Sequence, residues 1–205
     1  MRHLSLDEFT SHLASADPTP GGGSASAVAG AFGAALIAML ARLSMGRGGD
    51  DALFTRTAEG MDRVRTTLLD LAAQDARAFD VVMAATRMPR RSDEEKQART
   101  SAVQRAMRDA AEVPLDVAGQ AVTVLEAACQ ILPTANPNAA SDGGVAVLLS
   151  YAAAQGAIAN VRINLASIRE EAYRTATAVR VEDLAQRSTA LRDQGMALME
   201  ERLTR

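Results

Sequence analysis

The stretch from Ser24 to Ala41 reads SASAVAGAFGAALIAMLA and contains no charged residue. Small residues recur in it at every fourth position, as at Ala29 and Gly33. Residues four apart lie on one face of an α-helix, and small side chains there let a neighbouring helix approach closely. We therefore expect a closely packed helix from Ser24 to about Met45, ended by the glycines that follow.

The same stretch is long enough to span a bilayer. Most of it is Ala, Gly and Ser, however, so that insertion into lipid would gain little free energy. The residues before Pro18 carry charges and lack the continuous apolar region of a secretory signal. The sequence thus favours the central helix of a soluble protein over a membrane span.

The rest of the chain has apolar patterns of helical period separated by short breaks, without the alternation that predicts strands. Ser5 with Glu8 and Ser92 with Glu95 have the spacing of capping boxes, which mark helix starts. The other expected helices run from residue 5 to before 18, from about 51 to 88, from 92 to 131 with a kink or split at Pro114, from 143 to about 168, and from about 174 to 203. We predict an all-α, up-and-down bundle of long helices that forms a single domain over residues 1–205.

The composition argues against several classes of function. The net charge of −3 lacks the basic footprint of a nucleic-acid binder. Cys129 is the only cysteine, so an internal disulfide is impossible and a reducing, cytoplasmic setting is expected. His3 and His12 both lie in the first dozen residues, which argues against histidine catalysis and metal ligation.

Asp75 is the most informative polar residue. It occupies a seam of helical spacing whose other members are apolar: Met61, Val64, Leu68, Leu71, Ala78 and Val82. Burial of an unpaired carboxylate costs several kcal/mol in order of magnitude, so the group needs a partner, a proton or a use. On spacing alone, a structural ion pair with an arginine, an exposed end of the seam and a functional carboxylate all remain open.

Two glycine-rich turns lead directly into expected helices. Gly21, Gly22, Gly23 and Ser24 form one, and Ser141 and Asp142 with the two following glycines form the other. Free N–H groups at a helix start can receive an anion. Neither turn fits a Walker loop or a dinucleotide fingerprint, and simple helix starts are the alternative.

Asn160 and Asn164 lie one helical turn apart in an otherwise apolar helix. An asparagine in a helix is commonly solvated or tethers two helices, and a role in a binding site is the alternative.

Together these segments resemble one family. PTPGGGSASAVAGAFGAALIAML, QDARAFDVVMAA with a Met-Pro stop, DEEK, VPL and NPNAASDGGVAVLLSYAAAQGAIANVRINL occur here in the order and spacing of the cyclodeaminase/cyclohydrolase family of tetrahydrofolate enzymes. The resemblance covers about residues 18 to 165.

The resemblance implies an all-helical homodimer that binds a folate in a cleft near the helix ends, without a metal or redox cofactor. It also implies that Asp75, in the D-x-x-A-F motif, is catalytic. Where family members often have a Gly-Lys-Lys-Lys-Tyr stretch, this chain keeps one positive charge, at Arg47. The other implied substrate-binding residues are Gly21, Gly22, Gly23, Ser24, Asn136, Asn138, Ser141, Asp142, Asn160, Arg162 and Asn164.

The activity that the resemblance implies is hydrolysis of 5,10-methenyltetrahydrofolate to 10-formyltetrahydrofolate. The alternative is a formiminotetrahydrofolate cyclodeaminase, which releases ammonia. We expect the hydrolase because 205 residues leave no room for a fused formiminotransferase domain, and because hydrolysis demands less acid chemistry. A non-catalytic folate-binding or scaffold protein is the third possibility, and neither nucleic acid nor membrane is an expected partner.

Overall fold

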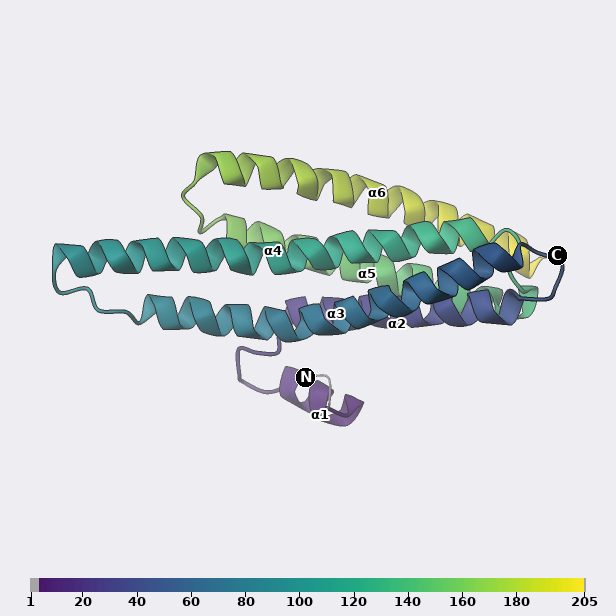
Figure 1. The fold of residues 1–205 in the computed structure, drawn as a ribbon, viewed down its shortest axis with the longest axis horizontal. Coiled ribbons are helices and arrows are strands. Elements are labelled where there is room, and N and C mark those ends of the chain that lie inside the picture. The colour runs from purple at the N-terminus through teal and green to yellow at the C-terminus, as the bar shows by residue number, and fades with distance from the viewer. Residues whose placement is uncertain (1–3, 205) are drawn as a thin grey trace.

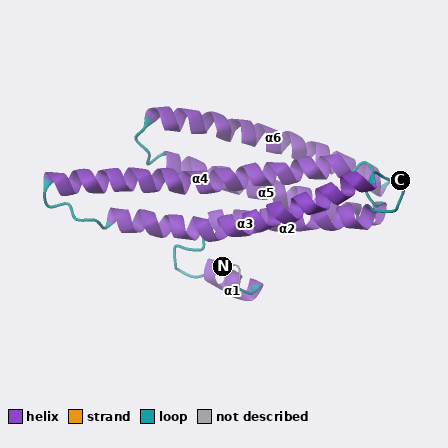
Figure 2. Ribbon diagram, in the orientation of Figure 1, coloured by secondary structure: helices purple, strands orange, loops and turns teal. Residues whose placement is uncertain are grey.

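The computed structural model describes residues 4–204, which form six α-helices and, within that range, no strand (Figure 1 and Figure 2). His3 lies outside the described residues. The elements are α1 (Leu6–Leu13), α2 (Gly22–Ser44), α3 (Asp51–Thr86), α4 (Asp93–Ile131), the short 3-10 turn η1 (Pro137–Ala139), α5 (Ala140–Leu165) and α6 (Glu171–Leu203). The predicted all-α fold is confirmed.

Both predicted capping boxes are present. The Glu8 amide donates to Ser5 Oγ at 3.2 Å, and the Ser5 amide donates to Glu8 Oε2 at 2.7 Å. Ser92 and Glu95 make the same exchange at the start of α4. α5 begins at Ala140, earlier than the predicted start at residue 143, as a continuation of η1.

Four long helices form the body of the bundle. α2 packs against α3 and α5, and α4 packs against the same two helices, while α6 lies on α4 and α5. α1 is short and lies on the outside of the bundle, where its buried Phe9 meets residues of α2 and α3 (Figure 1). This arrangement places α2 and α5 side by side behind α3 and α4.

The small residues of α2 allow a close crossing with α5. A β-carbon at Gly33 would lie 2.2 Å from Ser150 Oγ, and one at Gly30 would lie 3.4 Å from the Ala153 Cβ. On the α5 side, a β-carbon at Gly156 would lie 2.4 Å from Ser26 Oγ. The predicted close packing of this helix is therefore confirmed.

Pro114 does not split α4, which runs continuously through it. A proline has no N–H, so the Ala110 carbonyl loses the donor that position 114 would supply in an α-helix. The Asn164 side chain of α5 replaces that donor, with its Nδ2 2.9 Å from the Ala110 oxygen. The buried ring of Pro114 is thus tolerated because a second helix satisfies the carbonyl.

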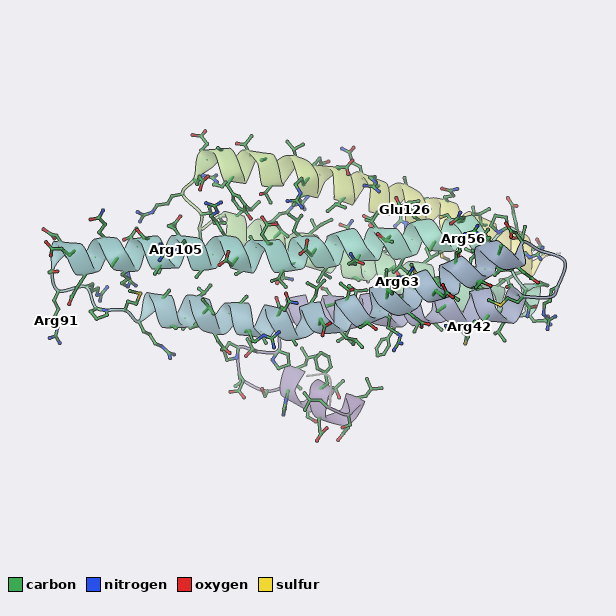
Figure 3. All side chains as sticks on the ribbon, in the orientation of Figure 1. Arg42, Arg56, Arg63, Arg91, Arg105 and Glu126 are labelled. Atoms are coloured by element: carbon green, nitrogen blue, oxygen red, sulfur yellow. The ribbon has the colours of Figure 1, made fainter. Side chains whose placement is uncertain are left out.

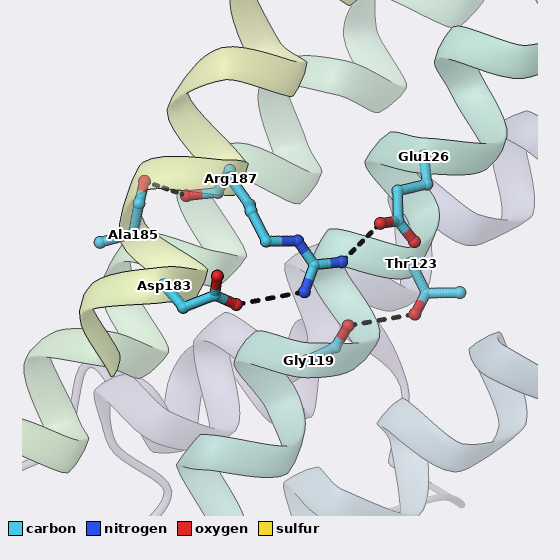
Figure 4. A network of polar contacts seen from close by, with 7 residues as sticks. Gly119, Thr123, Glu126, Asp183, Ala185 and Arg187 are labelled. Atoms are coloured by element: carbon cyan, nitrogen blue, oxygen red, sulfur yellow. Dashed lines mark hydrogen bonds and ion pairs between the residues drawn. The ribbon is translucent and has the colours of Figure 1, made fainter. Parts of the chain in front are cut away.

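The last helix packs through apolar residues and also makes polar contacts with α4 at its surface. Arg187 donates to Glu126 on α4 at 2.6 Å and to Asp183 on its own helix at 3.2 Å (Figure 4). Exposed ion pairs contribute about 0–1 kcal/mol each to the free energy of unfolding, so this network adds little to stability. The labelled arginines in Figure 3 are spread along the bundle, without a single basic patch among them.

Gly22–Ser44 and Pro137–Leu165 are both long and apolar enough to cross a membrane by length and composition. In the bundle, 61% of the most apolar window of the first and 50% of that of the second are buried. A core helix of a bundle gives the same signal.

Candidate active site around Asp75

A cavity of about 250 Å³ opens where α2 begins. Residues of four helices line it, where the start of α2 lies beside the second half of α3, the middle of α4 and the last part of α5. The lining residues are Pro18, Thr19 and Gly21 to Gly23 before and at the start of α2, Asp75, Ala78, Phe79 and Val82 on α3, Met107 and Ala110 on α4, and Asn160 and Asn164 on α5.

Asp75 is the only residue with an ionisable side chain among those that line the cavity. Its Oδ2 accepts a hydrogen bond of 2.8 Å from Ser24 Oγ. Burial raises the pKa of Asp75, and the hydrogen bonds from the Ser24 hydroxyl and amide oppose that rise. Of the three possibilities that the spacing left open, the arginine ion pair is excluded, since the partner is a serine.

Gly23 gives the carboxylate its room. A β-carbon at position 23 would lie 2.3 Å from Asp75 Oδ1 and 2.6 Å from Asp75 Cγ. The carboxylate therefore lies against the first turn of α2, at the positive end of the helix dipole. Gly21 and Gly22 line the same cavity, as predicted.

Ser24 does not line the cavity. Its side chain is completely buried, and its hydroxyl contacts Asp75 and the Ala72 carbonyl. The structure thus places the predicted residue Ser24 beneath the carboxylate and not in the cavity wall, because the helix start turns its side chain inwards.

Asn160 and Asn164 both line the cavity, as predicted. Each also bonds to backbone: Asn160 Nδ2 donates to the Gly156 carbonyl at 2.8 Å, and Asn164 Nδ2 donates to that of Ala110. Asn164 is thus a helix tether and a lining residue at once. Each amide nitrogen keeps a second N–H, so the two side chains can offer both donors and acceptors to the cavity.

Arg162 does not belong to this cavity. Its guanidinium lies 3.9 Å from Glu182 on α6 and lines a separate groove between α5 and α6. Residues two apart point to different sides of a helix, so Arg162 cannot share the face of its two asparagine neighbours. Within one chain the structure therefore does not bring Arg162 together with Asn160 and Asn164.

The predicted loop residues lie at the far end of α2. Asn136 Nδ2 donates to the Leu43 carbonyl at 3.2 Å, and the Asn136 amide donates to Ser44 Oγ at 2.9 Å. Asn138 in turn donates its amide to Asn136 Oδ1, and Ser141 and Asp142 follow in the first turn of α5. With a rise of 1.5 Å per residue, α2 separates this loop from Asp75 by about 30 Å.

Arg47 also lies at that far end, in the exposed turn after α2. The structure therefore divides the predicted site residues into two groups. One group lies at the Asp75 cavity. The other lies at the opposite end of α2 and consists of Arg47, Asn136, Asn138, Ser141 and Asp142.

The sequence interpretation missed the apolar wall that Phe79, Met107 and Ala110 form. Ala78 and Val82 belonged to the recognised seam, but Met107 and Ala110 had no signal that separates a cavity wall from ordinary core. Among residues 4–204, no group of three His, Cys, Asp or Glu side chains is placed to hold a metal ion.

Comparisons with known proteins identify several relatives of this chain. A methenyltetrahydrofolate cyclohydrolase of Methylorubrum extorquens is 36% identical over 92% of this chain and 92% of its own length. A formimidoyltransferase-cyclodeaminase of Rattus norvegicus is 31% identical over 89% of this chain, which spans only 34% of that longer protein.

The crystal structure of a formiminotetrahydrofolate cyclodeaminase from Thermotoga maritima superimposes with a TM-score of 0.88 at 32% identity, covering 98% of each chain. Residues 5–183 match the formiminotransferase-cyclodeaminase family. The chain belongs to this family.

Proposed function

We propose that the protein hydrolyses 5,10-methenyltetrahydrofolate to 10-formyltetrahydrofolate at the Asp75 cavity. The observation that carries the proposal is a single carboxylate in a cavity whose described lining offers no cationic side chain. Such a site suits a substrate whose reacting centre is itself a cation. The similarity to a methenyltetrahydrofolate cyclohydrolase over nearly its whole length supports the same reaction.

The methenyl carbon bridges N5 and N10 and carries delocalised positive charge. Ionised Asp75 would stabilise this charge and take a proton from the water that adds to the carbon. The bond from that carbon to N5 then breaks, Asp75 returns its proton to N5, and the new hydroxyl becomes the formyl carbonyl as its proton leaves to solvent. The products are 10-formyltetrahydrofolate and one net proton.

Formiminotetrahydrofolate cyclodeamination is the second candidate, favoured by the close structural likeness to the Thermotoga maritima cyclodeaminase. There N5 and N10 become bridged as ammonia departs, and Asp75 would carry the proton to the leaving nitrogen.

Purified protein offered each substrate separately decides between these reactions. We expect catalysed loss of the methenyl absorbance, faster than ammonia release from formiminotetrahydrofolate. Ammonia release without methenyl hydrolysis would establish the cyclodeaminase instead. Neither signal, with tetrahydrofolate still bound, would indicate a non-catalytic folate-binding protein.

We also propose that the chain forms a homodimer through the outer side of α2 and α5. Six of the ten exposed large apolar side chains among the described residues lie on these two helices, with exposures of 36% to 71%. We call them the apolar face: Phe32, Met39, Leu43, Val145, Leu148 and Ile163. Two helices about 10 Å wide and about 35 Å long offer roughly 700 Å², close to the ~800 Å² per partner of a stable interface.

An antiparallel pair would bring the two groups of predicted site residues together. A two-fold axis across the helices would place the far end of each α2, with Arg47, beside the start of α2 in the other chain. The same arrangement would bring the loop of Asn138, Ser141 and Asp142 towards the partner's cavity.

Mixed dimers test this arrangement. Co-expressed Asp75→Asn and Asp142→Ala chains would combine both defects in one site of a heterodimer and leave its other site intact. We expect each variant alone to be nearly inactive and the mixture to regain about a quarter of wild-type activity. A mixture no more active than its parents would contradict a shared site, and full activity of Asp142→Ala alone would exclude the loop from it.

A further inference from the structure

The hydroxyl of Ser24 has two acceptors within reach, and this inference, which rests on the proposed function, concerns its choice between them. Ser24 Oγ lies 2.8 Å from Asp75 Oδ2 and 3.0 Å from the Ala72 carbonyl oxygen. A hydroxyl carries one proton and two lone pairs, so it can donate to only one of the two at a time.

The two donations suit different protonation states of Asp75. When Asp75 is ionised, both of its oxygens only accept, and the hydroxyl proton is held best by Oδ2 because a charge-assisted hydrogen bond is the stronger one. When Asp75 is protonated on Oδ2, the acid must donate, and Ser24 Oγ can accept once its own proton has turned to the Ala72 carbonyl.

Neither state leaves a buried polar atom unsatisfied. The Ala72 carbonyl lies within α3, where the helix supplies its regular donor, so it tolerates the loss of the hydroxyl. Ser24 is 0% exposed, so no water competes for these contacts. A buried carboxylate that must gain and lose a proton in each turnover would otherwise lack a partner in one of its states.

We propose that Ser24 is a positioning residue whose hydroxyl turns between Asp75 Oδ2 and the Ala72 carbonyl as Asp75 loses and gains its proton. Oδ2 keeps Ser24 Oγ as its partner in both states. Ser24 itself does not touch the substrate, since its side chain lies beneath the cavity rather than in its wall.

Ser24→Ala tests the proposal, and Ser26→Ala is the matched control. Ser26 lies on the same helix and bonds to the Gly22 carbonyl, away from the carboxylate. Activity that needs ionised Asp75 falls on the acidic side of the pH profile. Without the Ser24 hydrogen bond the pKa of Asp75 rises further, so in Ser24→Ala this limb should move to higher pH by about one unit. At a fixed pH on this acidic limb we expect kcat to fall about tenfold, with KM changed less than twofold and the control unchanged.

A direct titration separates this inference from the proposed function. The Asp75 carboxyl can be followed by carbon NMR in the substrate-free protein, with Asp75→Asn for assignment and thermal melting to confirm the fold. A higher pKa in Ser24→Ala than in Ser26→Ala supports the positioning role even if neither folate is turned over. An unchanged pKa in the folded variant overturns it, as does a loss of activity that appears only as a raised KM.

Discussion

Gly23 and Asp75 fit together across two helices, because a single carbon added to Gly23 would come within 2.3 Å of Asp75 Oδ1. Any other residue at position 23 must therefore displace the carboxylate. The position of the Asp75 carboxylate on α3 therefore depends on the missing side chain at Gly23 on α2.

Gly23→Ala should accordingly lower activity far more than stability. The added methyl group moves Asp75 away from the cavity, and a misplacement of about 1 Å can cost on the order of a hundredfold in rate. Turnover and thermal melting should be measured together. Gly119→Ala on α4 is the control, since nothing lies within 4 Å of a β-carbon there. Normal turnover in Gly23→Ala would mean that Asp75 can act from another position.

Asp75→Asn should remove activity by about a hundredfold or more while the fold persists, because an amide has nearly the same shape but cannot take a proton. Its melting temperature at neutral pH should equal or exceed that of the wild type. Burial raises the pKa of folded Asp75, so its contribution to stability is present at low pH and is lost as pH rises through that raised pKa.

Melting curves at several pH values test the direction of this pH dependence. The advantage of Asp75→Asn should shrink towards acid and vanish below about 3.9, the ordinary aspartate pKa. A variant that melts well below the wild type at neutral pH, yet turns over normally once folded, would make Asp75 a structural residue.

Ser150→Ala should stabilise the protein by roughly 1 kcal/mol, since Ser150 Oγ is buried without a hydrogen-bond partner among the described residues. The same change should make Gly33→Ala less damaging, because the atom that a β-carbon at position 33 would meet is that hydroxyl oxygen. Gly33→Leu should cost roughly 1–3 kcal/mol or more. Chemical denaturation of the single and double variants gives the coupling, and strictly additive effects would contradict the contact.

Leu148→Glu should convert the proposed dimer to a monomer, because it places a charge in the middle of the apolar face. Val179→Glu on α6 is the matched control, since this side chain is also exposed but lies outside that face. Light scattering coupled to size-exclusion chromatography measures the mass. The same mass for wild type and Leu148→Glu would exclude this face as the interface.

Local chemistry made most of the fold predictable. A capping box such as Ser5 with Glu8 is complete within four residues, and the apolar seam around Asp75 requires only helical period. The observed helices accordingly start and end within a few residues of their predicted limits. Pro114 was harder to interpret, because the donor that keeps α4 intact comes from a residue fifty positions later in the chain.

The site was predicted less completely than the fold. A charge in an apolar seam and a glycine run are unusual by themselves, but only the resemblance to a family assigned Asp75 and the glycines to a site. Arg162 lies on another face of α5 than Asn160 and Asn164, because residues two apart in a helix point to different sides. The inward turn of Ser24 depends on how α2 meets α3, which no local pattern records.

The hydrogen bond from Asn164 to the Ala110 carbonyl also limits which substitutions this sequence can accept during evolution. While residue 114 is a proline, loss of the Asn164 amide orphans a carbonyl in the cavity wall. If residue 114 has an N–H, that group can donate to the Ala110 carbonyl itself. Position 164 is then constrained only by the ligand. The two positions should therefore be epistatic, with a change at 114 permitting changes at 164 that would otherwise be rejected.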